Sequence, residues 1–98
     1  MDFKILIADS ALADLREIVE FVAQDDPDAA IRLGEKLVGC ALSLRTMPAR
    51  FPLHDRQCGI RKMTVAPYLV FYTCNEATAV VSVLHFWHGA RRSPRFGV

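Results

Sequence analysis

The second half of the chain contains Gly59-Ile60-Arg61-Lys62-Met63, Pro67-Tyr68-Leu69-Val70-Phe71-Tyr72 and His85-Phe86-Trp87-His88-Gly89-Ala90-Arg91-Arg92. β-branched and aromatic residues dominate these segments, a composition that favours strands. We predict strands over residues 60–65, 68–74 and 78–87, with a hairpin turn at Asn75-Glu76-Ala77 between the last two. Cations and aromatic rings would then gather at one edge of a small sheet, where a nucleic acid or an acidic protein surface could bind.

A short strand and a helix are predicted at the start of the chain. Residues 3–7 alternate in the manner of a strand. Asp9-Ser10 then supplies polar side chains suited to a helix N-cap, and apolar residues recur at helical spacing from Leu12 to Val22. We expect this helix to end near Gln24-Asp25.

A second helix is predicted to follow directly. Asp26 can cap it, and Pro27 suits its first position because the N–H that proline lacks would be unpaired there anyway. An apolar stripe continues to about Arg45. Gly34 and Gly39 lower helix propensity by about 1 kcal/mol each. We therefore expect close packing against the first helix to compensate.

The element order, strand, helix, helix and three strands (βααβββ), favours an α+β fold in two layers. The helical hairpin should pack on one face of a small, mainly antiparallel sheet, with residues 46–58 as a surface loop. A chain of 98 residues has room for a single domain, 1–98, with one core. Its hydrophobic content of 52% is high for such a domain, so we expect exposed apolar area and a permanent partner.

The sequence favours a reduced, cytoplasmic location with no membrane contact. The longest apolar stretch, Ala77 to Trp87, is too short to span a bilayer, and the first residues do not begin a secretion signal. Three cysteines, Cys40, Cys58 and Cys74, give no disulfide framework. No histidine or cysteine pair has a metal-ligand spacing, so we expect neither a metal site nor a cofactor.

Charge is divided unevenly along the chain. Residues 1–47 hold nine acidic and five basic side chains, whereas residues 48–98 hold two acidic and seven basic ones. A basic region attracts polyanions even when the whole chain is near neutral. The alternative is that the two halves simply neutralise one another in the fold.

Alternation along the predicted strands assigns side chains to faces. Arg61 and Lys62 should lie on opposite faces of the strand over 60–65. His85 should share a face with Val81, Val83 and Trp87, in a strand that is apolar on both sides. We expect His85 to be hydrogen-bonded and largely buried.

Five short motifs follow one another along the chain: Ala11-x-x-Asp14-Leu15-x-x-Ile18, Asp26-x-x-Ala29-Ala30, Gly59-Ile60-Arg61-Lys62-Met63, Pro67-Tyr68-Leu69-Val70-Phe71-Tyr72, and Val83-Leu84-His85 leading to His88-Gly89-Ala90-Arg91. Together with the order βααβββ, they resemble the RelE/ParE toxin superfamily over roughly residues 3–92. The resemblance implies a RelE-like fold and the toxin of a bacterial type II toxin–antitoxin module, of the plasmid-stabilisation type. It also implies a cognate antitoxin that neutralises the toxin within a hetero-oligomer.

The superfamily has two branches that differ in target. RelE-like members cleave messenger RNA on the ribosome, whereas ParE-like members are associated with poisoning DNA gyrase and have no known cleavage activity. RelE-like nucleases use strand lysines, later arginines and often a C-terminal tyrosine; Lys62 and Arg91 match two of these positions. Leu69 stands where an arginine is expected, and no tyrosine follows Arg91. The departures favour the ParE-like branch.

The residues expected to contact a target or an antitoxin are cations and rings of the last three strands and the tail: Arg61, Lys62, Trp87, His88, Arg91, Arg92 and Arg95. No catalytic residue is assigned firmly. A nuclease would use Lys62, His88 and Arg91, because RNA cleavage needs proton-transfer groups and cations around the developing phosphorane charge. Structural roles stay open as well: Arg61 as a loop anchor, Trp87 in the core, and the arginines as a solvated tail.

We therefore expect a ParE-like toxin that inhibits an essential target such as DNA gyrase and is held inactive by a cognate antitoxin. Two alternatives stay open. One is a RelE-like, ribosome-dependent endoribonuclease that cleaves messenger RNA, and the other is a non-toxic homologue that only binds a partner.

Overall fold

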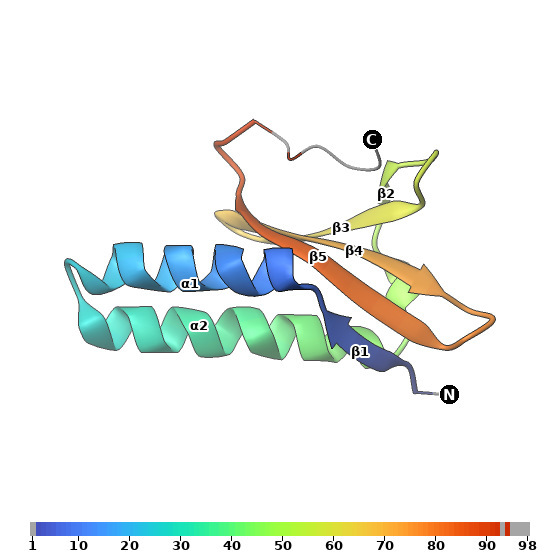
Figure 1. Cartoon of the computed structure of the whole chain (residues 1–98), viewed down its shortest axis with the longest axis horizontal. Helices are drawn as coiled ribbons and strands as arrows, with labels where there is room; N and C mark the ends of the chain where they lie inside the picture. The colour runs from blue at the N-terminus through green and yellow to red at the C-terminus, as the bar shows by residue number, and fades with distance from the viewer. Residues whose placement is uncertain (1, 93, 95–98) are drawn as a thin grey trace.

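A helical hairpin packs on one face of a five-stranded sheet (Figure 1). The structure is a computed structural model, and it describes residues 2–92 and 94. The elements are β1 (Lys4–Ile7), α1 (Asp9–Ala23), α2 (Pro27–Leu42), β2 (Leu53–Asp55), β3 (Ile60–Val65), β4 (Tyr68–Asn75) and β5 (Val80–His88). Two single turns of 3₁₀ helix, Ser43–Arg45 and Pro48–Arg50, connect α2 to β2.

The strands lie in the order β1-β5-β4-β3-β2. β1 is parallel to β5, and every other neighbouring pair is antiparallel. The predicted two-layer α+β fold with a mainly antiparallel sheet is confirmed. The predicted order βααβββ omits β2, which lies inside the segment that was expected to be a loop. A strand of three residues is too short for alternation to be detected.

The two helices begin differently. Asp26 caps α2 as predicted, because its Oδ1 accepts a hydrogen bond from Ala29 N at 3.1 Å. The predicted Asp9-Ser10 cap of α1 is wrong: the helix begins at Asp9, and the cap position is Ala8, which makes no side-chain hydrogen bond. Ser10 Oγ instead donates to Leu84 O at 2.7 Å and ties the first turn of α1 to β5.

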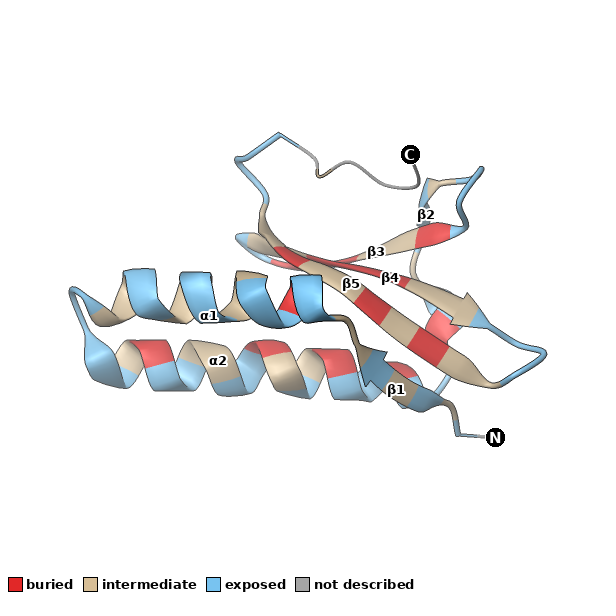
Figure 2. Cartoon of the chain, viewed as in Figure 1, coloured by how far each residue is buried: buried red, intermediate tan, exposed pale blue. Residues whose placement is uncertain are grey.

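The core lies between the helical hairpin and the inner face of the sheet and is formed by buried residues of both layers. Figure 2 shows where these residues lie along the helices and strands. The largest fully buried side chains include Tyr72, Phe86, Leu37 and Leu44. Removing each apolar side chain of this size from water contributes about 1.5–3 kcal/mol. The described helices include none with the length and apolar character that crossing a membrane requires.

The two helical glycines differ in their surroundings. A Cβ at Gly34 would lie 3.3 Å from Val19 Cγ2, so the helices approach closely there, as predicted. A Cβ at Gly39 would meet no atom within 4 Å. Close packing therefore accounts for Gly34, and the prediction is wrong for Gly39.

An irregularity in β5 changes the face on which its last residues lie. Phe71 pairs with His85, but the next residue, Tyr72, pairs with Val83, so Leu84 is an extra residue in β5. Val83 and Phe86 both belong to the core. His85 therefore lies on the opposite face from Val83. The prediction that His85 shares a face with Val81 and Val83 is wrong, because a bulge interrupts strict alternation.

Side chains of the sheet hold the segment between α2 and β2. The buried hydroxyl of Tyr72 donates a hydrogen bond to Pro48 O, and Arg61 Nη1 donates to Phe51 O at 2.6 Å. Burial raises the pKa of Tyr72 to about 12, although the positive charges of Arg61 and Arg50 partly oppose the increase. The phenol thus stays protonated and remains a donor at neutral pH.

Candidate functional site

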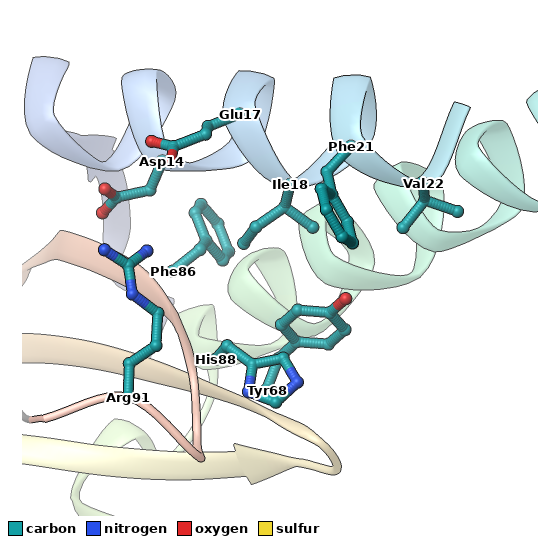
Figure 3. A pocket seen from close by; sticks show the side chains of 9 residues that line it. All are labelled: Asp14, Glu17, Ile18, Phe21, Val22, Tyr68, Phe86, His88 and Arg91. Carbon is teal, nitrogen blue, oxygen red and sulfur yellow. The ribbon is translucent and has the colours of Figure 1, made fainter. Parts of the chain in front are cut away.

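A pocket of about 340 Å³ lies between α1 and the sheet, where β4 begins and β5 ends (Figure 3). From α1 it is lined by Asp14, Glu17, Ile18, Phe21 and Val22. Their spacing (i, i+3, i+4, i+7, i+8) places all of them on one face of the helix. From the sheet it is lined by Tyr68, Phe86 and His88, and by Arg91 just beyond β5. The pocket is thus built from two segments that are far apart in the sequence.

The pocket combines apolar walls with a charged rim. Figure 3 shows the rings of Phe21, Phe86 and Tyr68 around the hollow. Phe21 is 71% exposed although it lines the hollow, which is unusual for a side chain of its size. The carboxylates of α1 line one side, and the guanidinium of Arg91 points toward them from the other side (Figure 3).

One of the two carboxylates already has a partner. Asp14 Oδ2 lies 2.7 Å from Nδ1 of His85, and both side chains are largely buried. The contact is an ion pair when the imidazole is protonated. It joins α1 to β5 beside the pocket. His85 is therefore hydrogen-bonded and largely buried, as the sequence predicts.

The chain turns tightly after β5. Gly89 N donates to Pro67 O at 2.8 Å, and a Cβ at Gly89 would lie 3.0 Å from that same oxygen. The close approach explains why glycine occupies the position. Ala90 N donates to Nδ1 of His88 at 3.1 Å, so Nδ1 is the unprotonated nitrogen of this ring. The His88 ring also packs edge-on against Tyr68, with centroids 5.3 Å apart.

Trp87 orders the residues that follow this turn. Its Nε1 donates to Arg92 O at 2.8 Å. The guanidinium carbon of Arg91 lies 4.7 Å from the centroid of the indole ring, a cation–π contact. The His85 ring packs edge-on against Trp87, with ring centroids 5.5 Å apart. The two arginines are thus presented by a backbone that the indole holds in place.

The arrangement offers binding groups: a hollow with aromatic walls, a carboxylate on α1 and ordered cations after β5. In the part of the chain that the structure describes, no three His, Cys, Asp or Glu side chains are grouped so that they could hold a metal ion.

The family model described as "ParE toxin of type II toxin-antitoxin system, parDE" matches residues 5–93. The chain belongs to the ParE toxin family. The sequence-based prediction of a type II toxin of the RelE/ParE superfamily is thereby confirmed. A search of curated protein sequences gives no significant match.

Two solved structures share the ParE-like fold of this chain. One is the chromosomal ParDE toxin–antitoxin system from P. aeruginosa, at 16% identity and a TM-score of 0.76, over 88% of this chain and 95% of that chain. The other is the toxin–antitoxin complex RelBE2 from Mycobacterium tuberculosis, at 20% identity and a TM-score of 0.69, over 90% of this chain and 99% of that chain. At these identities the likeness concerns the fold.

The ParE-like fold brings together some of the residues predicted to contact a target or an antitoxin. Trp87, Arg91 and Arg92 form one cluster at the end of β5, where Trp87 contacts the Arg91 guanidinium and the Arg92 carbonyl. His88 contacts Tyr68 and Ala90 and lines the pocket with Arg91. Arg61 is instead a loop anchor through Phe51 O, the structural role left open above. Arg95 lies outside the described residues.

Lys62 does not join this cluster. It pairs with Phe71 in the sheet and lies on the opposite face of β3 from Met63 and Val65, which belong to the core. His88 pairs with Tyr68, which pairs with Val65, so His88 lies on the core side. The three residues that a nuclease would use are therefore divided between two faces of the sheet.

Sequence reasoning did not select the α1 half of the pocket. The sequence pattern places Asp14 and Glu17 on the polar side of an amphipathic helix, and it assigns no role to Phe21. The signal for the site was available in Phe21, a large aromatic residue one helical turn beyond Glu17. The sequence does not reveal which residues of the sheet line the other half of the pocket, because local periodicity says nothing about contacts between distant segments.

Proposed function

We propose that this ParE-family toxin acts in the cytoplasm by binding DNA gyrase, and that a cognate antitoxin neutralises it. The observation that carries the proposal is the pair Arg91 and Arg92, both exposed just beyond β5, where the Arg91 guanidinium packs on Trp87 and the Arg92 carbonyl accepts the indole N–H. Cations with a packed side chain, such as Arg91 on Trp87, lose less side-chain freedom on binding than cations on a mobile tail. They suit an acidic protein surface.

Exposed apolar side chains support an antitoxin partner. Met47 is 76% exposed, Phe21 71% and Ile31 60%. Apolar side chains that remain exposed in quantity mark surfaces for protein partners. An antitoxin covering part of this surface would account for the hydrophobic content of the chain.

The geometry does not favour the nuclease alternative. Lys62 and His88 lie on opposite faces of the sheet, so they could not act on one phosphodiester group together. No structural observation favours a non-toxic homologue either.

The test measures supercoiling by gyrase with relaxed plasmid and ATP. We expect the purified chain to inhibit supercoiling and to trap cleaved DNA. Reversing both charges (Arg91→Glu with Arg92→Glu) should raise the protein concentration needed for inhibition by at least about tenfold, because two cations of the contact are lost. The same variant should no longer kill cells when expressed without an antitoxin.

A matched control distinguishes the effect of these two positions from the effect of the change in net charge. Arg16→Glu with Arg32→Glu makes the same charge change at exposed positions of α1 and α2. This control should inhibit gyrase as the unmodified chain does. Full inhibition by a folded Arg91 and Arg92 variant would contradict the proposed contact, and normal supercoiling with the unmodified chain would exclude gyrase.

A further inference from the structure

We propose that the pocket and its rim bind a second copy of this chain, forming a two-fold symmetric dimer. The occupant follows from the arrangement of charge. In a two-fold interface the same patch meets itself, so each group must find its complement within that patch. Here the rim carries an acid on one side and a cation on the other, around an apolar centre.

The apolar centre is formed around Phe21. Its side chain is 71% exposed although it lines a hollow of about 340 Å³. The hairpin end of α1 projects beyond the sheet (Figure 1), and the exposed Phe21 lies in the last turn of this helix. In the dimer the two Phe21 rings meet near the symmetry axis, which removes both from water. Burying an aromatic side chain of this kind is a typical source of association energy.

The charges supply the orientation. Asp14 is engaged by His85, which leaves Glu17 as the open carboxylate of the α1 rim. Glu17 and Arg91 make no ion pair with each other or with any other residue that the structure describes. A two-fold rotation brings Glu17 of one copy to Arg91 of the other, and the contact occurs twice.

The size of the surface sets the expected strength. One pocket with its rim is smaller than the standard interface, which buries about 1,200–2,000 Å² in total. The dimer is therefore weak and depends on protein concentration. It does not depend on gyrase being the target, so the two proposals can fail separately.

Sedimentation velocity over a series of protein concentrations is the first test. The unmodified chain should shift from monomer to dimer as its concentration rises. Glu17→Arg and Arg91→Glu should each weaken the dimer by at least about tenfold, because like charges then meet at both symmetric contacts. Circular dichroism checks that each variant is folded.

Mixing the two single variants gives the sharpest result. In a pair of one Glu17→Arg chain and one Arg91→Glu chain, opposite charges meet at both contacts. The mixture should therefore form a heterodimer although each variant alone stays monomeric. Glu20→Arg and Arg92→Glu are matched controls, since both positions are exposed and neither lines the pocket.

Phe21→Ser tests the apolar centre. It should abolish dimerisation, whereas Ile31→Ser, at another exposed apolar position outside the pocket, should not. A chain that stays monomeric at all concentrations overturns the proposal, and so does a mixture of the two charge variants that does not associate. The proposal is also overturned if the surface binds only an antitoxin and the free chain remains monomeric.

Discussion

The hydroxyl of Tyr72 ties the core of the sheet to the segment after α2 through Pro48 O. Its pKa is raised to about 12 in the fold, against 10.0 for a free tyrosine, mainly because the ring is buried. Below pH 10 the phenol is protonated in both the folded and the unfolded chain, so the stabilisation by the buried, protonated phenol is fully present. Between pH 10 and 12 the unfolded chain loses the proton first, so the free energy of unfolding falls by up to about 3 kcal/mol.

Urea unfolding of the unmodified chain and of Tyr72→Phe measures this effect. At neutral pH the Phe variant should be less stable by about 1–2 kcal/mol, because a buried carbonyl loses its donor. As the pH rises from 10 to 12, the difference in unfolding free energy between the two proteins should shrink and then reverse, since only the unmodified chain carries the phenol at position 72. A difference that stays constant up to pH 12 would contradict the raised pKa.

His85 shows what can be predicted for a single residue. Its apolar surroundings in the sequence correctly predict a hydrogen-bonded, largely buried ring. They do not predict its partner, because Asp14 lies 71 positions away. Residue environment is a local property of the sequence, whereas pairing depends on how the elements pack.

At the scale of the helices, the two glycines of α2 make a matched pair. Gly39→Ala should stabilise the protein by about 1 kcal/mol, because alanine favours a helix and its Cβ would meet no atom within 4 Å. Gly34→Ala should stabilise it less or destabilise it, because its Cβ would lie 3.3 Å from Val19 Cγ2. Thermal unfolding of both variants measures the difference.

The comparison tests how closely the helices pack. Equal stabilisation by both substitutions would mean that α1 and α2 separate easily at Gly34. A loss of stability for Gly39→Ala would mean that this exposed position has contacts other than those described.

The strands show where sequence patterns succeed and where they fail. The strand over 60–65 is predicted with its bounds, and the last two strands within two residues at each end. Long apolar segments carry a strong signal for such elements. The bulge at Leu84 and the short β2 carry none, because both depend on pairing with a neighbouring strand.

At the scale of the whole molecule, acids and cations of the two halves face one another without forming Lys or Arg ion pairs among the described residues, where the one ion-pair contact joins Asp14 to His85. The acidic half forms β1 and the helical hairpin, whereas the described cations of the basic half lie before β3, in β3 and after β5. The two meet at the pocket, where Glu17 and Arg91 line opposite sides. The sequence predicts that charge is segregated, but the pocket where acids and cations meet follows only from the packing of α1 against β5.

Trp87 is the chain's single tryptophan, and it touches both Arg91 and His85. The ultraviolet fluorescence of an indole responds to charged and polar neighbours. The protein therefore carries an intrinsic optical probe beside its proposed contact surface. Any molecule that draws Arg91 away from the ring, whether a second copy, an antitoxin or gyrase, should change the emission, and binding could be followed in solution without attaching a dye.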